Sequence, residues 1–217
     1  MPAPDEQQAV YGPAFVHNCM LLIVRAHEAI GSKDLRGAEE PEITGLLVEQ
    51  AKELAEEEDA EDWLEHLEVI DDQPQNDLPD KLGKRRPRID IEFVRTGRGR
   101  RARFHVEAKR LYRSDSVGEY FGAGGIEMFL SGAYAAQWPW SGMVGYVQSD
   151  DKGTWLAALS AGFSTRKNKL SVCDGQPNWK KAKWPDSSVG EVHESCHVRT
   201  QEGLGKIEIY HLMLEFQ

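Results

Sequence analysis

Two short stretches of the chain alternate between apolar and polar residues, and this pattern predicts two β-strands. From 89 to 93 the odd positions are apolar and the even positions acidic, and from 104 to 108 the even positions are apolar and the odd positions ionisable. Side chains of a strand alternate between its two faces. Each strand therefore has one face for the core and one face that carries charge. The Gly/Arg-rich segment between them suits the turn of a hairpin.

The alternation also predicts how the two strands pair. A four-residue loop at 97–100 sets Asp90 directly opposite Glu107, and opposed side chains have Cβ atoms roughly 4.5–5.5 Å apart. A slip of one residue would turn the charged groups into the core. We therefore expect Asp90, Glu107 and Lys109 to converge on one face as a candidate divalent-metal site. The alternative is an ordinary solvated face, because an acid–x–Lys tripeptide is common; the upstream Asp90 favours the site.

Hydrophobic periodicity predicts further helices and strands. Helices are expected over 13–30, 41–54, 125–136 and 153–162, a buried central strand over 143–147 and a final strand over 206–216. We interpret the acidic run 53–72 as a helix or helical hairpin and 71–87 as a loop. Together the elements predict an α/β fold with a mixed β-sheet flanked by helices. We divide the chain into an N-terminal helical extension, 1–38, and a main domain, 39–217.

Charge is distributed unevenly along the chain. The net charge is −10, yet residues 81–113 hold 13 basic and 3 acidic residues, while residues 28–80 hold 19 acidic and 3 basic residues. A basic patch beside a carboxylate site suits a polyphosphate backbone. The cations that we expect to contact phosphate are Arg88, Arg98, Arg100, Arg101, Arg110, Lys180 and Lys181. The alternative is that the basic hairpin pairs internally with the acidic segment.

A second basic segment, from Asn178 to Trp184, interleaves two tryptophans with lysines. Exposed indoles in this segment would stack on bases beside the phosphate contacts. The alternative is a loop that two buried indoles hold in place, and both interpretations stay open.

The cysteines and histidines predict no additional chemistry. The chain has three cysteines, which are far apart and odd in number: Cys19, Cys173 and Cys196. We expect no disulfide framework and no paired zinc motif. His193 and His197, beside Cys196, are expected to be structural because further metal ligands are missing, and His105 is expected to be a surface residue. No apolar stretch reaches the length of a membrane span, so we expect a soluble, cytoplasmic protein.

The spacing of the charged residues resembles a known group of enzymes. Asp90 followed by Glu107-Ala108-Lys109 is similar to the PD-(D/E)xK nuclease superfamily, whose fold is called restriction-endonuclease-like, although Ile89 stands where the motif name has proline. From about residue 39 to its end, the chain also resembles small bacterial nuclease-like proteins of this superfamily. The similar segments are EPEIT, RIDIEF, HVEAKRL, GAGGIEMFLSGAY, MVGYV, Ser195-Cys196-His197 and YHLMLEF.

The resemblance implies a restriction-endonuclease-like sheet with an antiparallel active-site hairpin, and metal-dependent hydrolysis of phosphodiester bonds. Asp90, Glu107 and the backbone carbonyl of Ala108 would bind Mg²⁺ or Mn²⁺. Lys109 would orient the attacking water or help to deprotonate it, and would stabilise the transition state.

The resemblance also implies an acidic ligand from the first core helix. Glu42 is our choice and Glu40 the alternate, although both would also complement the helix N-terminal dipole. We expect DNA as the substrate, with RNA as the alternative. The expected assembly is a homo-oligomer or a partner subunit of a bacterial defence or repair complex.

Two other classes of function stay open. One is a nucleic-acid-binding subunit on the same fold that does not cleave. The other is an interaction protein that uses the acidic residues 39–72 as a docking surface. The joint presence of Asp90, Glu107 and Lys109 favours the nuclease, since a site without activity would tolerate the loss of any of them.

Overall fold

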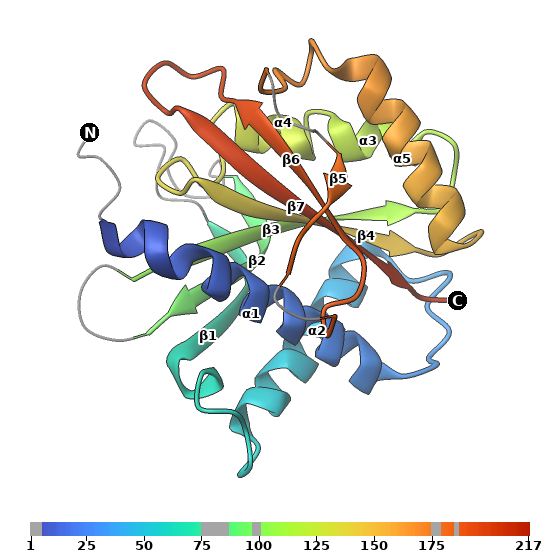
Figure 1. Ribbon diagram of the computed structural model, residues 1–217. Helices are drawn as coiled ribbons and strands as arrows, with labels where there is room; N and C mark the ends of the chain where they lie inside the picture. The colour runs from blue at the N-terminus through green and yellow to red at the C-terminus, as the bar shows by residue number, and fades with distance from the viewer. Residues whose placement is uncertain (1–5, 75–86, 97–100, 175–178, 185–186) are drawn as a thin grey trace.

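The fold is built on a seven-stranded mixed sheet with the strand order β1-β2-β3-β4-β7-β6-β5 (Figure 1). The computed structural model describes residues 6–74, 87–96, 101–174, 179–184 and 187–217. The strands are β1 (Leu67–Pro74), β2 (Arg88–Arg95), β3 (Arg103–Leu111), β4 (Trp140–Val147), β5 (Lys180–Lys181), β6 (Val192–Val198) and β7 (Lys206–Glu215). β1, β2 and β3 are antiparallel, β4 is parallel to β3 and to β7, and β6 is antiparallel to β5 and β7. The predicted mixed α/β class is confirmed.

Helices cover both faces of the sheet (Figure 1). They are α1 (Glu6–Ile30), α2 (Glu40–Glu56), α3 (Ser116–Phe121), α4 (Ile126–Leu130) and α5 (Lys152–Arg166), with a 3₁₀ turn η1 (Leu64–His66). On one face, the hydroxyls of Thr44 in α2 and Tyr146 in β4 are hydrogen-bonded at 2.9 Å. On the other, the hydroxyl of Tyr120 in α3 lies 2.9 Å from His211 Nδ1 in β7. α1 packs on α2, and α3, α4 and α5 lie across the sheet from them.

The core is continuous from α1 to β7. All residues of β4 are buried, so the predicted central strand at 143–147 is confirmed, as is the final strand near 206–216. The predicted helix at 153–162 corresponds to α5. Val16 and Leu22 of α1 belong to the same buried cluster as the sheet residues. The N-terminal helix therefore shares the core of the region that follows it, and it begins at Glu6 rather than at residue 13.

The acidic run 53–72 is not a helix or a helical hairpin, and this prediction is wrong. α2 ends at Glu56, and β1 begins at Leu67, within the predicted helix, and continues into the predicted loop. Val69 of β1 pairs with Phe93 of β2 and is buried, while Glu68 is exposed. Pairing with β2 and burial of the apolar side chain outweigh the local helical pattern. The helix predicted over 125–136 is also shorter, because α4 ends at Leu130.

Cys173 and Cys196 form a disulfide, with Cα atoms 5.5 Å apart, and Cys19 is a buried free thiol. From the sequence we expected no disulfide framework, and this single bridge was not predicted. The segment at 171–173 runs beside β6, where Cys173 N donates to Cys196 O at 2.9 Å and Val198 N donates to Ser171 O at 2.7 Å. This tertiary pairing, which cysteine spacing does not reveal, brings the two sulfur atoms together. In the described part of the chain, no helix has the length and apolarity needed to cross a membrane.

Candidate metal centre

The hairpin of β2 and β3 has the predicted register. Ile91 pairs with Val106 and Phe93 pairs with Phe104, and this register places Asp90 opposite Glu107. The apolar side chains on one face of the hairpin are buried in the core. The predicted turn at 97–100 lies outside the described residues, although Arg95 N, next to it, donates to Ala102 O at 2.9 Å in the same register.

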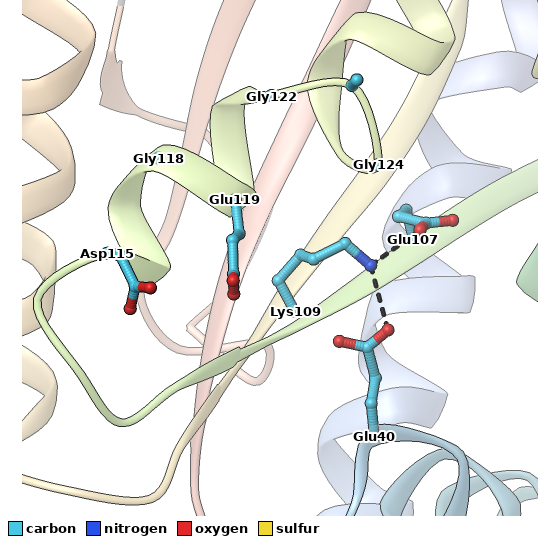
Figure 2. Close-up of a pocket in the computed structure, with 9 residues that line it drawn as sticks. Glu40, Glu107, Lys109, Asp115, Gly118, Glu119, Gly122 and Gly124 are labelled. Carbon is cyan, nitrogen blue, oxygen red and sulfur yellow. Dashed lines mark hydrogen bonds and ion pairs between the residues drawn. The ribbon is translucent and has the colours of Figure 1, made fainter.

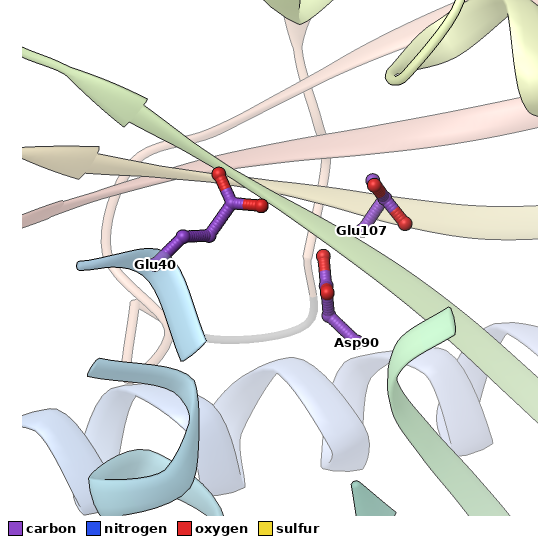
Figure 3. Close-up of side chains that lie close together, drawn as sticks. All are labelled: Glu40, Asp90 and Glu107. Atoms are coloured by element: carbon purple, nitrogen blue, oxygen red, sulfur yellow. The ribbon is translucent and has the colours of Figure 1, made fainter. Parts of the chain in front are cut away.

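Three carboxylates from separate elements meet above the hairpin (Figure 3). Glu40, Asp90 and Glu107 each offer an oxygen atom within 4.8 Å of the others. Asp90 is oriented by a hydrogen bond, since its Oδ2 accepts from Ala108 N at 2.7 Å. Glu40 is the first residue of α2, so the start of this helix supplies the third acid. Glu42 is exposed and lies outside the group, because two residues turn the helix by about 200°.

The ammonium group of Lys109 lies among these oxygen atoms (Figure 2). Its Nζ donates to Glu107 Oε1 at 2.8 Å, to Glu40 Oε1 at 3.0 Å and to the backbone oxygen of Ala108 at 2.5 Å. Two of these three acceptors, Glu107 and the Ala108 carbonyl, were predicted as metal ligands. Lys109 therefore balances part of the negative charge that converges here.

Burial strongly changes the acidity of these groups. Loss of water, reinforced by the Asp90 carboxylate, raises the pKa of Glu107 to about 8. Loss of water also raises the pKa of Asp90 to about 6, against the opposing effect of Lys109. Burial lowers the pKa of Lys109, but the surrounding carboxylates, Glu107 foremost, raise it by more and leave the pKa above its ordinary value. Lys109 therefore keeps its proton in the centre. The carboxyl groups of Glu107 and Asp90 ionise less readily than usual when no further cation is bound.

One oxygen of the centre accepts no hydrogen bond of good geometry from the described residues, although the side chains of Tyr134 and Asp90 interact with the same carboxyl group. Glu107 is 5 % exposed, and its Oε2 is buried without such a bond in the described part of the chain. A buried carboxylate oxygen without a donor is costly, because it loses its hydration and gains nothing in return. Three convergent carboxylates with an unsatisfied oxygen match the hard oxygen ligands that Mg²⁺ and Mn²⁺ prefer. The residues present therefore fit a divalent cation.

The centre opens into a pocket of about 740 Å³. Glu40, Glu107 and Lys109 form one side. The other side comes from α3 and the turn after it, and is formed by Asp115, Gly118, Glu119, Gly122, Ala123 and Gly124 (Figure 2). This geometry gives a ligand access to the carboxylates from the side of the glycine-rich segment.

Gln148, at the end of β4, supports the position of Glu40, and sequence reasoning missed it. Its Nε2 donates to Leu35 O at 2.5 Å and to Ala38 O at 2.9 Å, and its Oε1 accepts from Arg110 Nε at 2.7 Å. Arg110 also forms an ion pair with Glu39, the residue before α2. Gln148 and Arg110 thus hold the segment that carries Glu40. A buried amide after a strand gives no sequence signal for such a role.

Tyr134 is a second neighbour of the centre that sequence reasoning missed. Its hydroxyl donates to Arg88 O at 2.6 Å, two residues before Asp90. Burial, and then the charges of Glu107 and Asp90, raise its pKa above the ordinary value. The hydroxyl is therefore neutral and fixes the backbone beside the acid pair. The sequence signal that could have identified Tyr134 was its position after α4 within the glycine-rich segment.

Several predicted phosphate contacts are ion-paired within the protein. Arg88 pairs with Asp72, Arg110 with Glu39, and Lys180 with Glu194 at 2.7 Å. Arg101 and Lys181 are exposed, and Arg98 and Arg100 lie outside the described residues. The arrangement favours the alternative in which much of the basic charge is neutralised internally, and it does not bring these cations into the pocket wall.

His105 is not a surface residue, so that prediction is wrong. It is 2 % exposed, and its Nε2 lies 3.2 Å from Oε1 of Glu92, which also pairs with Arg103. Arg103 O in turn accepts a hydrogen bond from Trp140 Nε1 at 3.1 Å. The charged face of the hairpin is therefore buried at Glu92 and His105, while Asp90 and Lys109 are half-buried.

His197 and His211 are joined through Ser195 in a buried chain. Ser195 Oγ lies 2.7 Å from His197 Nε2 and 2.8 Å from His211 Nε2. His197 Nδ1 lies 2.7 Å from Leu170 O, and His211 Nδ1 lies 2.9 Å from the Tyr120 hydroxyl. Since a carbonyl only accepts, His197 Nδ1 carries a proton, and each remaining bond then has one donor when both histidines are neutral. Burial accordingly lowers the pKa of His197 to about 4 and that of His211 well below its usual value.

The two tryptophans of the second basic segment pack inward. Trp179 stacks on His193 at 5.6 Å between ring centroids and lies 4.5 Å from His211, and Trp184 lies 5.2 Å from Tyr210. These contacts favour the interpretation in which the indoles hold the loop in place over stacking on bases.

Comparison with known proteins identifies no relative: no family model, curated protein or solved structure shows significant similarity to the chain. A proposal for its function therefore depends on the geometry of the centre and on the motif.

Proposed function

We propose that the chain is a metal-dependent nuclease of the PD-(D/E)xK type that hydrolyses phosphodiester bonds, with DNA as the expected substrate. The observation that carries this proposal is the convergence of Glu40, Asp90 and Glu107 within 4.8 Å, with Lys109 bound to two of them. The antiparallel β2–β3 hairpin and the helices on both sides of the sheet are compatible with a restriction-endonuclease-like fold. The expected setting is a bacterial defence or repair system.

The residues have distinct roles in this mechanism. Glu40, Asp90 and Glu107, with the Ala108 carbonyl, would hold Mg²⁺ or Mn²⁺. A bound ion would supply an activated water and neutralise charge that builds on the phosphate. Lys109, which lines the pocket beside Glu40 and Glu107, would then face the phosphate. Its ammonium group would stabilise the phosphate in the transition state.

The first test is metal binding. Calorimetric titration with Mn²⁺ should show binding by the wild type and at least a tenfold loss of affinity in Asp90→Asn and Glu107→Gln. Glu40→Gln and Glu42→Gln form a matched pair on one helix. The first should weaken binding and the second should leave it unchanged, because only Glu40 belongs to the carboxylate group.

The second test is cleavage. Labelled single-stranded and duplex DNA and RNA are incubated with wild type in Mg²⁺ and Mn²⁺, and Lys109→Ala should lose at least a hundredfold in rate while it retains Mn²⁺ binding. If the wild type binds Mn²⁺ and nucleic acid but cleaves none of the substrates, a non-cleaving binding subunit replaces the nuclease. If Asp90→Asn cleaves as fast as the wild type, the assigned centre is wrong.

A further inference from the structure

Two glycines in the pocket wall are not explained by packing. A Cβ added at Gly118 or Gly124 would meet no atom of the described chain within 4 Å, and neither residue has a positive φ. Gly122 and Gly125, in the same segment, differ from them. A Cβ at these two positions would lie 2.8 Å from Gly118 O and 2.1 Å from Tyr120 O. The fold therefore requires glycine at 122 and 125, but not at 118 and 124.

Glycine at position 118 also opposes the local structure. Gly118 lies within α3, where alanine would favour the helix more strongly. Both Gly118 and Gly124 are exposed, and both line the pocket opposite Lys109 (Figure 2). The missing side chains thus keep open the space that faces the centre.

The candidate cation site opens into the same pocket, which indicates that a ligand enters there. Glu107 lines this pocket, is nine-tenths or more buried, and has an Oε2 atom that accepts no hydrogen bond of good geometry in the described part of the chain. Asp115 and Glu119, which also line the pocket, pair with Arg113 at 2.5 Å and 2.6 Å. These pairs reduce the repulsion that the two carboxylates would exert on an incoming phosphate.

We propose that Gly118 and Gly124 form a close-approach wall against which the sugar–phosphate backbone of a nucleic-acid strand lies while its scissile phosphate is at the carboxylate group. This inference rests on the proposed function and adds the place where the strand passes. Without Cβ atoms, the main chain of α3 and of the following turn can contact the strand directly. The wall selects for a strand by its shape, since it offers no side chain to read a base.

Substitutions at Gly118 separate this role from folding. Gly118→Ala and Gly118→Leu both favour the helix, so the thermal midpoint should stay unchanged or rise. The Kd for a labelled oligonucleotide should rise about tenfold in the alanine variant and further in the leucine variant. Gly124→Ala should act in the same direction. Fluorescence anisotropy in a Lys109→Ala background measures binding without cleavage, with single-stranded DNA, duplex DNA and RNA as probes.

Gly45→Ala is the matched control. Gly45 also lies inside a helix, α2, with nothing within 4 Å of an added Cβ, but it does not line the pocket. This variant should bind the probes like its parent. The wall is refuted if Gly118→Leu binds every probe as tightly as the parent, or if the parent binds none. Mn²⁺ titration of the wild type distinguishes failure of the two proposals. If only the glycine wall is wrong, the wild type still binds Mn²⁺. If the wild type does not bind Mn²⁺, the metal centre is wrong.

Discussion

At the scale of single residues, the burial of Glu107 makes the stability of the metal-free protein depend on pH. Removal from water and the nearby Asp90 raise its pKa from 4.5 to about 8. The folded protein holds this proton more tightly than the unfolded chain, so the stabilisation is complete below about pH 4.5 and is lost as the pH rises through about 8. Each unit of difference corresponds to about 1.4 kcal/mol, so the loss amounts to a few kcal/mol.

Denaturant unfolding in EDTA at pH 5, 6, 7 and 8 tests this prediction. The advantage of the wild type over Glu107→Gln in free energy of unfolding should shrink steadily as the pH rises, since the variant lacks the titrating group. The buried histidines have lowered pKa values, so they reduce stability as the pH falls. This contribution is the same in both proteins and cancels in the difference. Glu42→Gln, at an exposed site, should follow the wild type. Parallel curves for wild type and Glu107→Gln would contradict the prediction.

The acid pair was accessible to sequence reasoning, whereas the choice between two candidates for the third acid was not. Alternation in β2 and β3 predicts the opposition of Asp90 and Glu107, because a pleated strand fixes which side chains share a face. The choice between Glu40 and Glu42 depends on where the start of α2 lies relative to the sheet. That position is set by tertiary contacts such as Gln148 with residues 35–38, which local periodicity does not contain.

At the scale of elements, the link between β4 and α2 should control the metal centre. Gln148→Leu removes the donor of two backbone carbonyls and the acceptor of Arg110 Nε. The free energy of unfolding should therefore fall by about 2 kcal/mol. Because Glu40 follows the segment that Gln148 holds, Mn²⁺ affinity should fall about tenfold. Asp34→Ala, in the same segment, removes only an exposed pair with Arg36 and should change both quantities little. Unchanged Mn²⁺ affinity in Gln148→Leu would refute the link.

The Tyr120–His211–Ser195–His197 chain should act as one unit that ties α3 to β6 and β7. Ser195→Ala deletes the central group and leaves two buried imidazole nitrogens without partners, so the free energy of unfolding should fall by about 2–3 kcal/mol. Ser164→Ala, at an exposed position of α5, is the control and should change stability by less than about 0.5 kcal/mol. Thermal and denaturant unfolding measure both variants. Equal stability of the two would show that the chain is not cooperative.

The same elements show why β1 escaped prediction while β4 did not. β4 is a short, continuous apolar run, which reports burial on both faces directly. β1 lies at the edge of the sheet with acidic residues at exposed positions, and such a sequence matches a solvated helix equally well. Its strand conformation follows from the register with β2, in which Val69 meets Phe93.

At the scale of the whole molecule, the acidic and basic blocks of the sequence partly neutralise each other across β1 and β2. Asp72 of β1, in the acidic block, pairs with Arg88 of β2, in the basic block. The charge blocks therefore predict contacts between elements as well as contacts with a partner. The disulfide between Cys173 and Cys196 was equally hidden, because it depends on a segment that folds back along β6.

Internal pairing should limit what Arg88 contributes to nucleic-acid binding. A phosphate must compete with Asp72 for this guanidinium, and an exposed pair of this kind is worth about 0.2–1 kcal/mol. Asp72→Asn removes the ion pair and a negative charge, while Arg88 keeps its bond to the backbone oxygen of residue 72. Affinity for duplex DNA should therefore rise by up to about fivefold, and the slope of log K against log salt should steepen by about one. Anisotropy titrations at several salt concentrations measure both quantities. Asp34→Asn, which alters the exposed Asp34–Arg36 pair, is the charge-matched control. An equal gain in affinity in that variant would assign the effect to net charge alone. No gain in Asp72→Asn would exclude Arg88 as a phosphate contact.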